Sequence, residues 1–230
     1  MSDPLTIVFA LYPGVTHLDF TGPHQVLAQL PGARVIAASE QGGAIEAEGL
    51  TFANLTRLSD VTACDVICIP GGFGCAAAMN DEAFMAQIRR LAGSARYVTS
   101  VCTGSLILGA AGLLKGNRAA CHWAWRDQLE PFGAIPDSAR VVRDGNVFTG
   151  GGVTAGIDFA LTLAAEIAGA TVAQAIQLSL EYSPAPPFNA GRPETAPPAV
   201  LALVQQRLSA AEPARRAAVL TAADALDSRT

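Results

Sequence analysis

The chain has 230 residues, of which 50% are hydrophobic and 15% are charged, so it can bury the core of one large α/β domain. Its formal net charge is −5 and it has no basic run, which argues against nucleic acid as the main partner. No apolar run reaches the ~18 residues of a membrane span, and the first residues lack the features of a signal peptide. We therefore expect a cytoplasmic protein without a membrane partner.

Strands alternate with helices along most of the chain. We expect strands at 5–11, 34–38, 65–69 and 97–101 and a hairpin at 44–53. We also expect a first helix that ends at Pro31, and two further helices at 81–91 and 105–114. Further on we expect a short strand at 118–120, helices at 122–129, 154–168 and 171–180, and a hairpin around Asp144-Gly145. This alternation predicts a parallel sheet with helices on both faces and ligands at the carboxyl ends of its strands.

Cys102 lies where the pattern changes from strand to helix. Residues 97–101 are mostly β-branched or aromatic, and the apolar residues from Ser105 onward suit a helix. A sharp strand-to-helix turn exposes its side chain, and the N–H groups and dipole of the following helix favour a thiolate. Cys102 is thus a candidate nucleophile, and the alternative is an inert buried cysteine.

Two more segments follow predicted strands and should meet Cys102 at the same edge. Asp19 is the candidate proton donor and acceptor, and its alternative role is to cap the first helix. Backbone N–H groups of Gly72 and Thr103 are candidate donors to developing charge, beside Gly71 in a glycine-rich corner.

The role of His122 and of the glycines at 150–152 stays open at this stage. His122 is either a second candidate base or a structural histidine beside Trp123. The glycines, Gly151 among them, either form a close strand–helix junction or leave room for substrate. The cysteines are odd in number and have no zinc-type spacing with the histidines, so we expect neither a disulfide framework nor a metal site.

The amino-acid composition changes near residue 183. Six of the 14 prolines lie between Pro184 and Pro198, which favours an extended surface segment. The following residues are rich in Ala, Leu and Arg at helical spacing. We therefore divide the chain into an α/β domain (1–183), a proline-rich segment (184–198) and a helical appendage (199–230) that packs on the body or on a second subunit.

Three short motifs of the chain are Phe20-Thr21-Gly22-Pro23, Ile69-Pro70-Gly71-Gly72 and Ser100-Val101-Cys102-Thr103-Gly104. They resemble the landmarks of the ThiJ/PfpI superfamily, and within it the isocyanide-hydrating members. Residues 18–24, 97–114, 141–146, 149–165 and 181–191 are similar to the isocyanide-hydrating branch. Peptidases and many glyoxalase-like members have His after the cysteine and Glu near the position of Asp19, so Thr103 and Asp19 argue against both activities.

The resemblance implies a flavodoxin-like three-layer sandwich with a mostly parallel sheet and a cysteine nucleophile elbow. It also implies a homodimer that needs no cofactor and hydrates a small-molecule isocyanide to an N-formamide. Cys102 would form a thioimidate, Asp19 would move protons, Thr103, Gly71, Gly72 and Gly151 would surround the reacting centre, and Val153 would pack near the cysteine.

Two rival functions from other classes remain open. One is a non-catalytic ligand sensor, since similar domains occur in transcription regulators; here the tail from residue 199 is too short, and the chain too acidic, for a convincing DNA-binding domain. The other is a redox sensor that uses oxidation of Cys102.

Overall fold

The computed structural model describes residues 4–228, so residues 1–3 and 229–230, at the ends of the predicted domain and appendage, lie outside it. Its centre is a seven-stranded sheet in the order β10-β11-β7-β6-β1-β2-β5. All neighbours are parallel except β10, which pairs antiparallel with β11. In chain order the strands are β1 (Leu5–Leu11), β2 (Ala33–Ser39), β5 (Thr56–Arg57), β6 (Val66–Ile69), β7 (Tyr97–Val101), β10 (Val141–Asp144) and β11 (Val147–Gly150).

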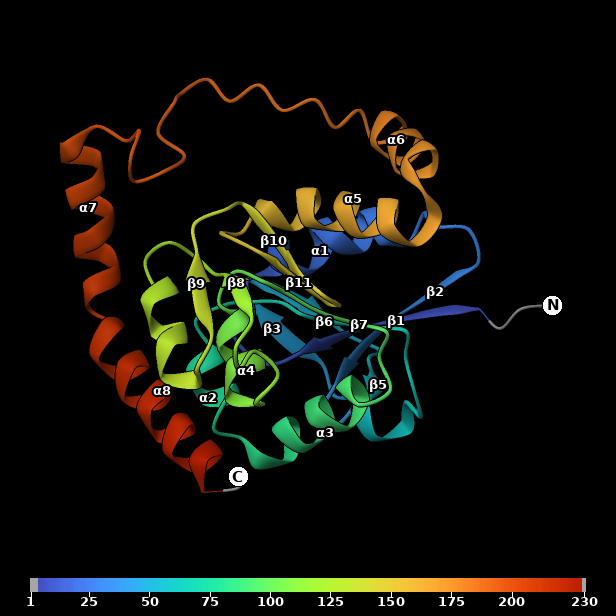
Figure 1. Ribbon diagram of the computed structural model, residues 1–230, viewed down its shortest axis with the longest axis horizontal. Helices are drawn as coiled ribbons and strands as arrows, with labels where there is room; N and C mark the ends of the chain where they lie inside the picture. The colour runs from blue at the N-terminus through green and yellow to red at the C-terminus, as the bar shows by residue number, and fades with distance from the viewer. Residues whose placement is uncertain (1–3, 229–230) are drawn as a thin grey trace.

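Helices cover both faces of the sheet, which confirms the predicted three-layer sandwich (Figure 1). One face is covered by α1 (His17–Leu27) and α5 (Ala155–Ala168), with α6 (Ala170–Ser179) packed against α5. The other face has α2 (Cys75–Ala78), α3 (Glu82–Ala92), α4 (Gly104–Ala110) and α8 (Glu212–Asp227). Within residues 4–228, none of the helices has the length and apolar character needed to cross a bilayer.

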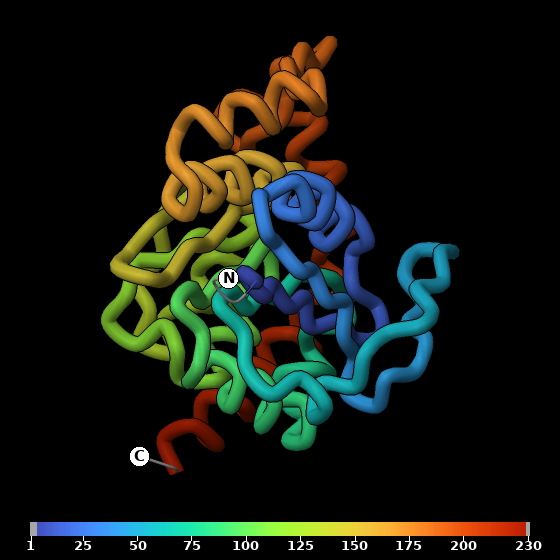
Figure 2. Tube along the Cα trace, turned by 90° about the vertical axis from the view of Figure 1, so that its right-hand side faces the viewer, coloured from blue at the N-terminus to red at the C-terminus, as the bar shows by residue number. Residues whose placement is uncertain are grey.

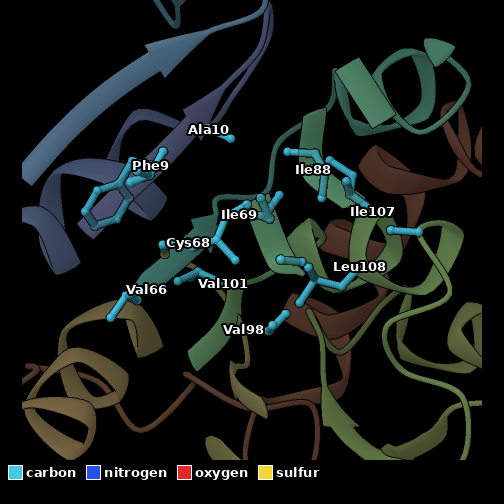
Figure 3. Packing of buried hydrophobic residues seen from close by; sticks show 14 of the residues in the cluster. Phe9, Ala10, Val66, Cys68, Ile69, Ile88, Val98, Val101, Ile107 and Leu108 are labelled. Atoms are coloured by element: carbon cyan, nitrogen blue, oxygen red, sulfur yellow. The ribbon is translucent and has the colours of Figure 1, made fainter. Parts of the chain in front are cut away.

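The central strands are buried on both faces, as parallel strands between helical layers must be. Every residue of β6 and β7 is buried, and the apolar runs predicted both strands from the sequence. Figure 3 shows Ile69, Ile88 and Ile107 gathered between the sheet and the helices on one face. This packing gives the carboxyl ends of the strands a rigid base.

Strand register sets the ends of three central strands level with one another. Ile69 of β6 pairs with Ser100 of β7, and Val101 of β7 pairs with Gly150 of β11. The residues that follow these strands therefore meet at one edge of the sheet, although they are far apart in sequence.

Several local predictions were wrong. Residues 122–125 form a turn rather than a helix, and the next residues form a 3-10 helix, η2 (Arg126–Phe132). The sequence also missed α2, β5, the short 3-10 helix η1 (Leu58–Asp60) and β9 (Ile135–Asp137), which pairs with β8 (Arg118–Ala120).

The predicted hairpin of β3 (Ile45–Ala47) and β4 (Leu50–Phe52) is present and projects from the body (Figure 2). Residues 180–197 belong to no helix or strand, and they arch over the outside of the molecule between α6 and α7 (Pro198–Ser209) (Figure 1). The last helix, α8, returns to the body and packs against α2, α4 and η2. The last helix therefore lies on the same side of the sheet as α4, which follows the turn after β7.

Candidate active site

Cys102 occupies the turn between β7 and α4 with a left-handed backbone, φ +58°. This conformation costs an L-residue on the order of 1–3 kcal/mol. Its N–H group donates to the carbonyl oxygens of Gly150 (3.0 Å) and Gly151 (2.8 Å), which hold the turn against the end of β11. The residue is 5% exposed. Strain maintained by surrounding hydrogen bonds at a buried thiol points to a functional role for this turn.

Glycines allow the turns after β6 and β7 to touch. A Cβ atom on Gly71 would lie 2.5 Å from the Thr103 nitrogen and 2.7 Å from Asp19 Oδ2, and one on Gly104 would overlap the Ile69 carbonyl oxygen. Any side chain at these positions would separate Asp19 from the turn that contains Cys102. Gly71 therefore has a steric role that its residue type alone did not indicate.

Asp19 lies in the first turn of α1, whose N-cap position is Thr16, so the alternative role of Asp19 as the cap is wrong. Its side chain is fully buried. Oδ2 accepts the Gly71 N–H at 2.9 Å, whereas Oδ1 has no N–H or O–H partner among residues 4–228. Burial raises the pKa of Asp19 to about 7, although hydrogen bonds from Gly71 and with Cys102 oppose the shift.

The Cys102 thiol and the Asp19 carboxyl group share a hydrogen bond and titrate as a pair. Burial raises the pKa of Cys102, and the charge of Asp19 adds to this. The expected lowering by the helix N-terminus is present as a hydrogen bond from the Thr103 N–H, but it is the smaller effect. Above about pH 7 the pair therefore retains one proton.

Thr103 connects this pair to the glycine corner. Its Oγ1 accepts the Gly72 N–H at 2.9 Å and donates to the Gly72 carbonyl oxygen at 3.2 Å. The N–H groups of Gly71 and Gly72 are thus used by Asp19 and Thr103. Of the predicted backbone donors, only the Thr103 N–H points at the sulfur, and the expectation that the Gly72 N–H faces the reacting centre does not hold here.

A cavity of about 350 Å³ opens onto Cys102. Its walls come from distant parts of the chain, namely Thr16, Glu48, Gly72, Phe73, Thr103, His122, Trp125, Val153, Val204, Arg207, Leu208 and Arg215. The predicted residues Gly72, Thr103 and Val153 therefore meet Cys102 in one cavity. Gly71 is not part of the wall but lies against Thr103 and Asp19, and Gly151 lines a neighbouring cavity that shares His122 and Val153.

His122 lies in the same cavity but is poorly suited to act as a base. Its Nδ1 accepts the Ala124 N–H at 3.3 Å, so the neutral ring has its proton on Nε2. Burial, and then the charge of Arg215, lower the pKa of His122 to about 4. The ring is thus a neutral hydrogen-bond donor near neutral pH.

Sequence reasoning missed three residues that shape the cavity. Glu48 sits at the tip of the β3–β4 hairpin, Trp125 precedes η2, and Arg215 belongs to α8. The Glu48-Gly49 turn was visible in the sequence, yet nothing there showed which way the hairpin folds. Trp125 and Arg215 meet only through packing of the last helix on the body.

The fold and the strained cysteine turn define a class of protein, and comparison with known proteins identifies it. The chain belongs to the DJ-1/PfpI family, whose model matches residues 5–166.

Among characterised relatives, it is 54% identical to the isonitrile hydratase of Pseudomonas putida over 204 residues, which cover 88% of this chain and 90% of that protein. A ThiJ/PfpI family protein from Pseudomonas syringae has a crystal structure that matches with a TM-score of 0.91 and 41% identity, covering 94% of this chain and 90% of that one. The DJ-1beta structure from Drosophila melanogaster matches with a TM-score of 0.69 and 25% identity, over 77% of this chain and 98% of that one.

Proposed function

We propose that this protein is a hydro-lyase that adds water to an organic isocyanide and releases an N-formamide. The observation that carries the proposal is the buried Cys102–Asp19 pair, which shares a proton beneath a cavity large enough for a small molecule. The similarity to an isonitrile hydratase over 88% of the chain supports this choice of reaction.

The first step is addition of Cys102 across the terminal carbon of the isocyanide. That carbon accepts a nucleophile and a proton at the same atom. The sulfur forms the C–S bond while the Asp19 carboxyl group gives the shared proton to the carbon. The product is a thioimidate, R–N=CH–S, on Cys102, and Asp19 is left as a carboxylate. A pair with one proton supplies what this step consumes.

The second step is hydrolysis of the thioimidate. Asp19 takes a proton from water and passes it to the imine nitrogen while the oxygen adds to the carbon. The C–S bond then breaks, its electron pair returns to sulfur, and the hydroxyl proton returns to Asp19. The N-formamide leaves, and the pair again holds one proton, so no cofactor is consumed.

Other residues position this pair or bound the substrate. The Thr103 N–H hydrogen-bonds to the sulfur and stabilises it as the leaving thiolate. Gly71 orients Asp19, and Gly72 orients the Thr103 side chain. Val153 contributes an apolar wall, and the Gly151 carbonyl oxygen holds the backbone of Cys102.

We further propose that the protein works as a homodimer in the cytoplasm. Large apolar side chains stay exposed outside the α5 layer and along the segment that follows it, among them Leu178 (81%), Phe188 (80%) and Leu203 (59%). A second copy of the chain would cover this surface, since apolar groups in such numbers favour association.

The direct test is turnover of phenyl isocyanide to N-phenylformamide, followed by liquid chromatography. The native protein should produce the formamide, and Cys102→Ala should not. Cys64→Ala is the matched control, because Cys64 is also buried but its sulfur faces the Leu91 carbonyl oxygen instead of the cavity. Formamide release by Cys102→Ala would refute the assignment of Cys102 as the nucleophile. If the native protein binds the isocyanide, or if its Cys102 is oxidised, without any release of formamide, a sensor function is favoured.

A further inference from the structure

Arg215 places a positive charge in the wall of the cavity, and residues 4–228 supply no counter-ion for it. The residue is 3% exposed, and its Nε has no hydrogen-bond partner in the described part of the chain. None of the carboxylates in residues 4–228 forms an ion pair with it. Burial of an unpaired charge is strongly unfavourable, so a position of this kind suggests a ligand that supplies the missing charge.

The guanidinium group of Arg215 stacks on aromatic rings. Its central carbon lies 4.0 Å from the centre of the Trp125 ring and 5.5 Å from that of Phe73, and both aromatic residues also line the cavity. Ring faces attract the cation but do not replace the acceptors that its in-plane N–H groups require. The stack therefore orients the guanidinium while leaving its hydrogen-bonding capacity available.

The other charged residues of the cavity are consistent with a site for an anion. Arg207 of α7 is exposed at the same cavity and adds a second positive charge. Glu48 is the opposing acidic residue, but it lies at the exposed hairpin tip and pairs with His17 at 3.8 Å. His122 is neutral near pH 7, and burial raises the pKa values of the other titratable groups near Arg215, which are Tyr12, Cys75 and Cys121. An anionic group that enters the cavity would meet the unpaired Arg215.

We propose that Arg215 is a substrate-binding residue that selects isocyanides bearing a carboxylate on the organic group. This inference rests on the proposed isocyanide hydration and adds the substrate class. The isocyano carbon would lie at Cys102, and the carboxylate would accept N–H groups from the edge of the guanidinium. Such charge-assisted pairing is bidentate when the planes match, which makes Arg more selective than Lys at this position.

Two substrates of similar size test the proposal, 4-isocyanobenzoate and the neutral 4-isocyanobenzamide. The native protein should hydrate the benzoate with a kcat/KM about 10- to 100-fold higher, mostly through KM, which is the range expected for a charge-assisted contact. Arg215→Met should remove this preference, so that the ratio of kcat/KM for the benzoate to kcat/KM for the benzamide falls to about one. Arg215→Lys, which retains the charge and guards against a folding defect, should keep part of it.

Arg216→Met is the matched control on the same helix, because Arg216 is exposed and pairs with Glu212 and Asp127. It should keep the full preference for the benzoate. An unchanged preference in Arg215→Met, or an equal loss for both substrates, would overturn the proposal.

Binding separates this proposal from the proposed function. If the native protein hydrates neither substrate, the hydratase proposal fails, and calorimetry with 4-formamidobenzoate then decides the role of Arg215. Binding to the native protein that is lost in Arg215→Met and retained in Arg216→Met would support the carboxylate site. Equal binding to both variants, or none to the native protein, would refute it.

Discussion

Asp19→Asn should change how the stability of the protein depends on pH. The Asp19 carboxyl group is fully buried, and its pKa is raised from 3.8 to about 7 mainly by burial. Between these values the unfolded chain releases the proton and the folded chain keeps it, so the free energy of unfolding falls as pH rises. Above about pH 7 the Asp19 carboxyl group is ionised in both the folded and the unfolded chain, and the folded protein bears the full cost of burying its charge.

The size of this penalty follows from the pKa shift. A rise of about 3 units corresponds to about 4 kcal/mol at about 1.4 kcal/mol per unit. Asparagine keeps an oxygen that can accept the Gly71 N–H and cannot ionise. Between about pH 5 and about pH 8, the stability of Asp19→Asn relative to the native protein should therefore rise by about 3 kcal/mol.

Urea unfolding at both pH values, under reducing conditions, measures this difference. Asp127→Asn is the control, since Asp127 is exposed at 63% and its pair with Arg216 is 3.4 Å long. Its stability relative to the native protein should be nearly the same at both pH values. If the stability of Asp19→Asn relative to the native protein is also the same at both pH values, the inference that buried Asp19 holds a proton up to about pH 7 is refuted. The same variant should lose most hydration activity, because no group remains to move the shared proton.

The remaining predictions concern the pH dependence of activity and the oligomeric state. The kcat/KM for a neutral isocyanide should rise with pH through about 7, because the Asp19–Cys102 pair reaches its one-proton form only above the pKa of Asp19. Steady-state rates measured across this pH range test the predicted rise, and a kcat/KM that falls through about pH 7 would contradict it. Sedimentation should give twice the monomer mass, and Leu178→Glu should reduce it; a native monomer would exclude the dimer.

Local sequence patterns predicted the central part of the fold and much of the site. The β-branched run before Cys102 and the apolar run after it define the strand, turn and helix. The parallel sheet then brings Asp19, Gly72 and Cys102 to one edge, because all of them follow central strands. These inferences need only periodicity and the rule that the carboxyl ends of parallel strands share an edge.

Features that depend on tertiary packing could not be predicted. The sequence suggested that a helix N-terminus lowers the pKa of Cys102, but burial and Asp19 reverse the direction. His122 looked like a candidate base until its Nδ1 was found to accept a backbone N–H. Arg215 belongs to a helix whose sequence gives no sign that it returns to the cavity, and its stack on Trp125 exists only in the folded chain.

Mass spectrometry of acid-quenched protein during turnover of phenyl isocyanide tests the covalent step of the proposed reaction. Cys102 should gain the mass of one isocyanide molecule, as a thioimidate that disappears when substrate is exhausted. Continued release of N-phenylformamide with Cys102 unmodified throughout would contradict it.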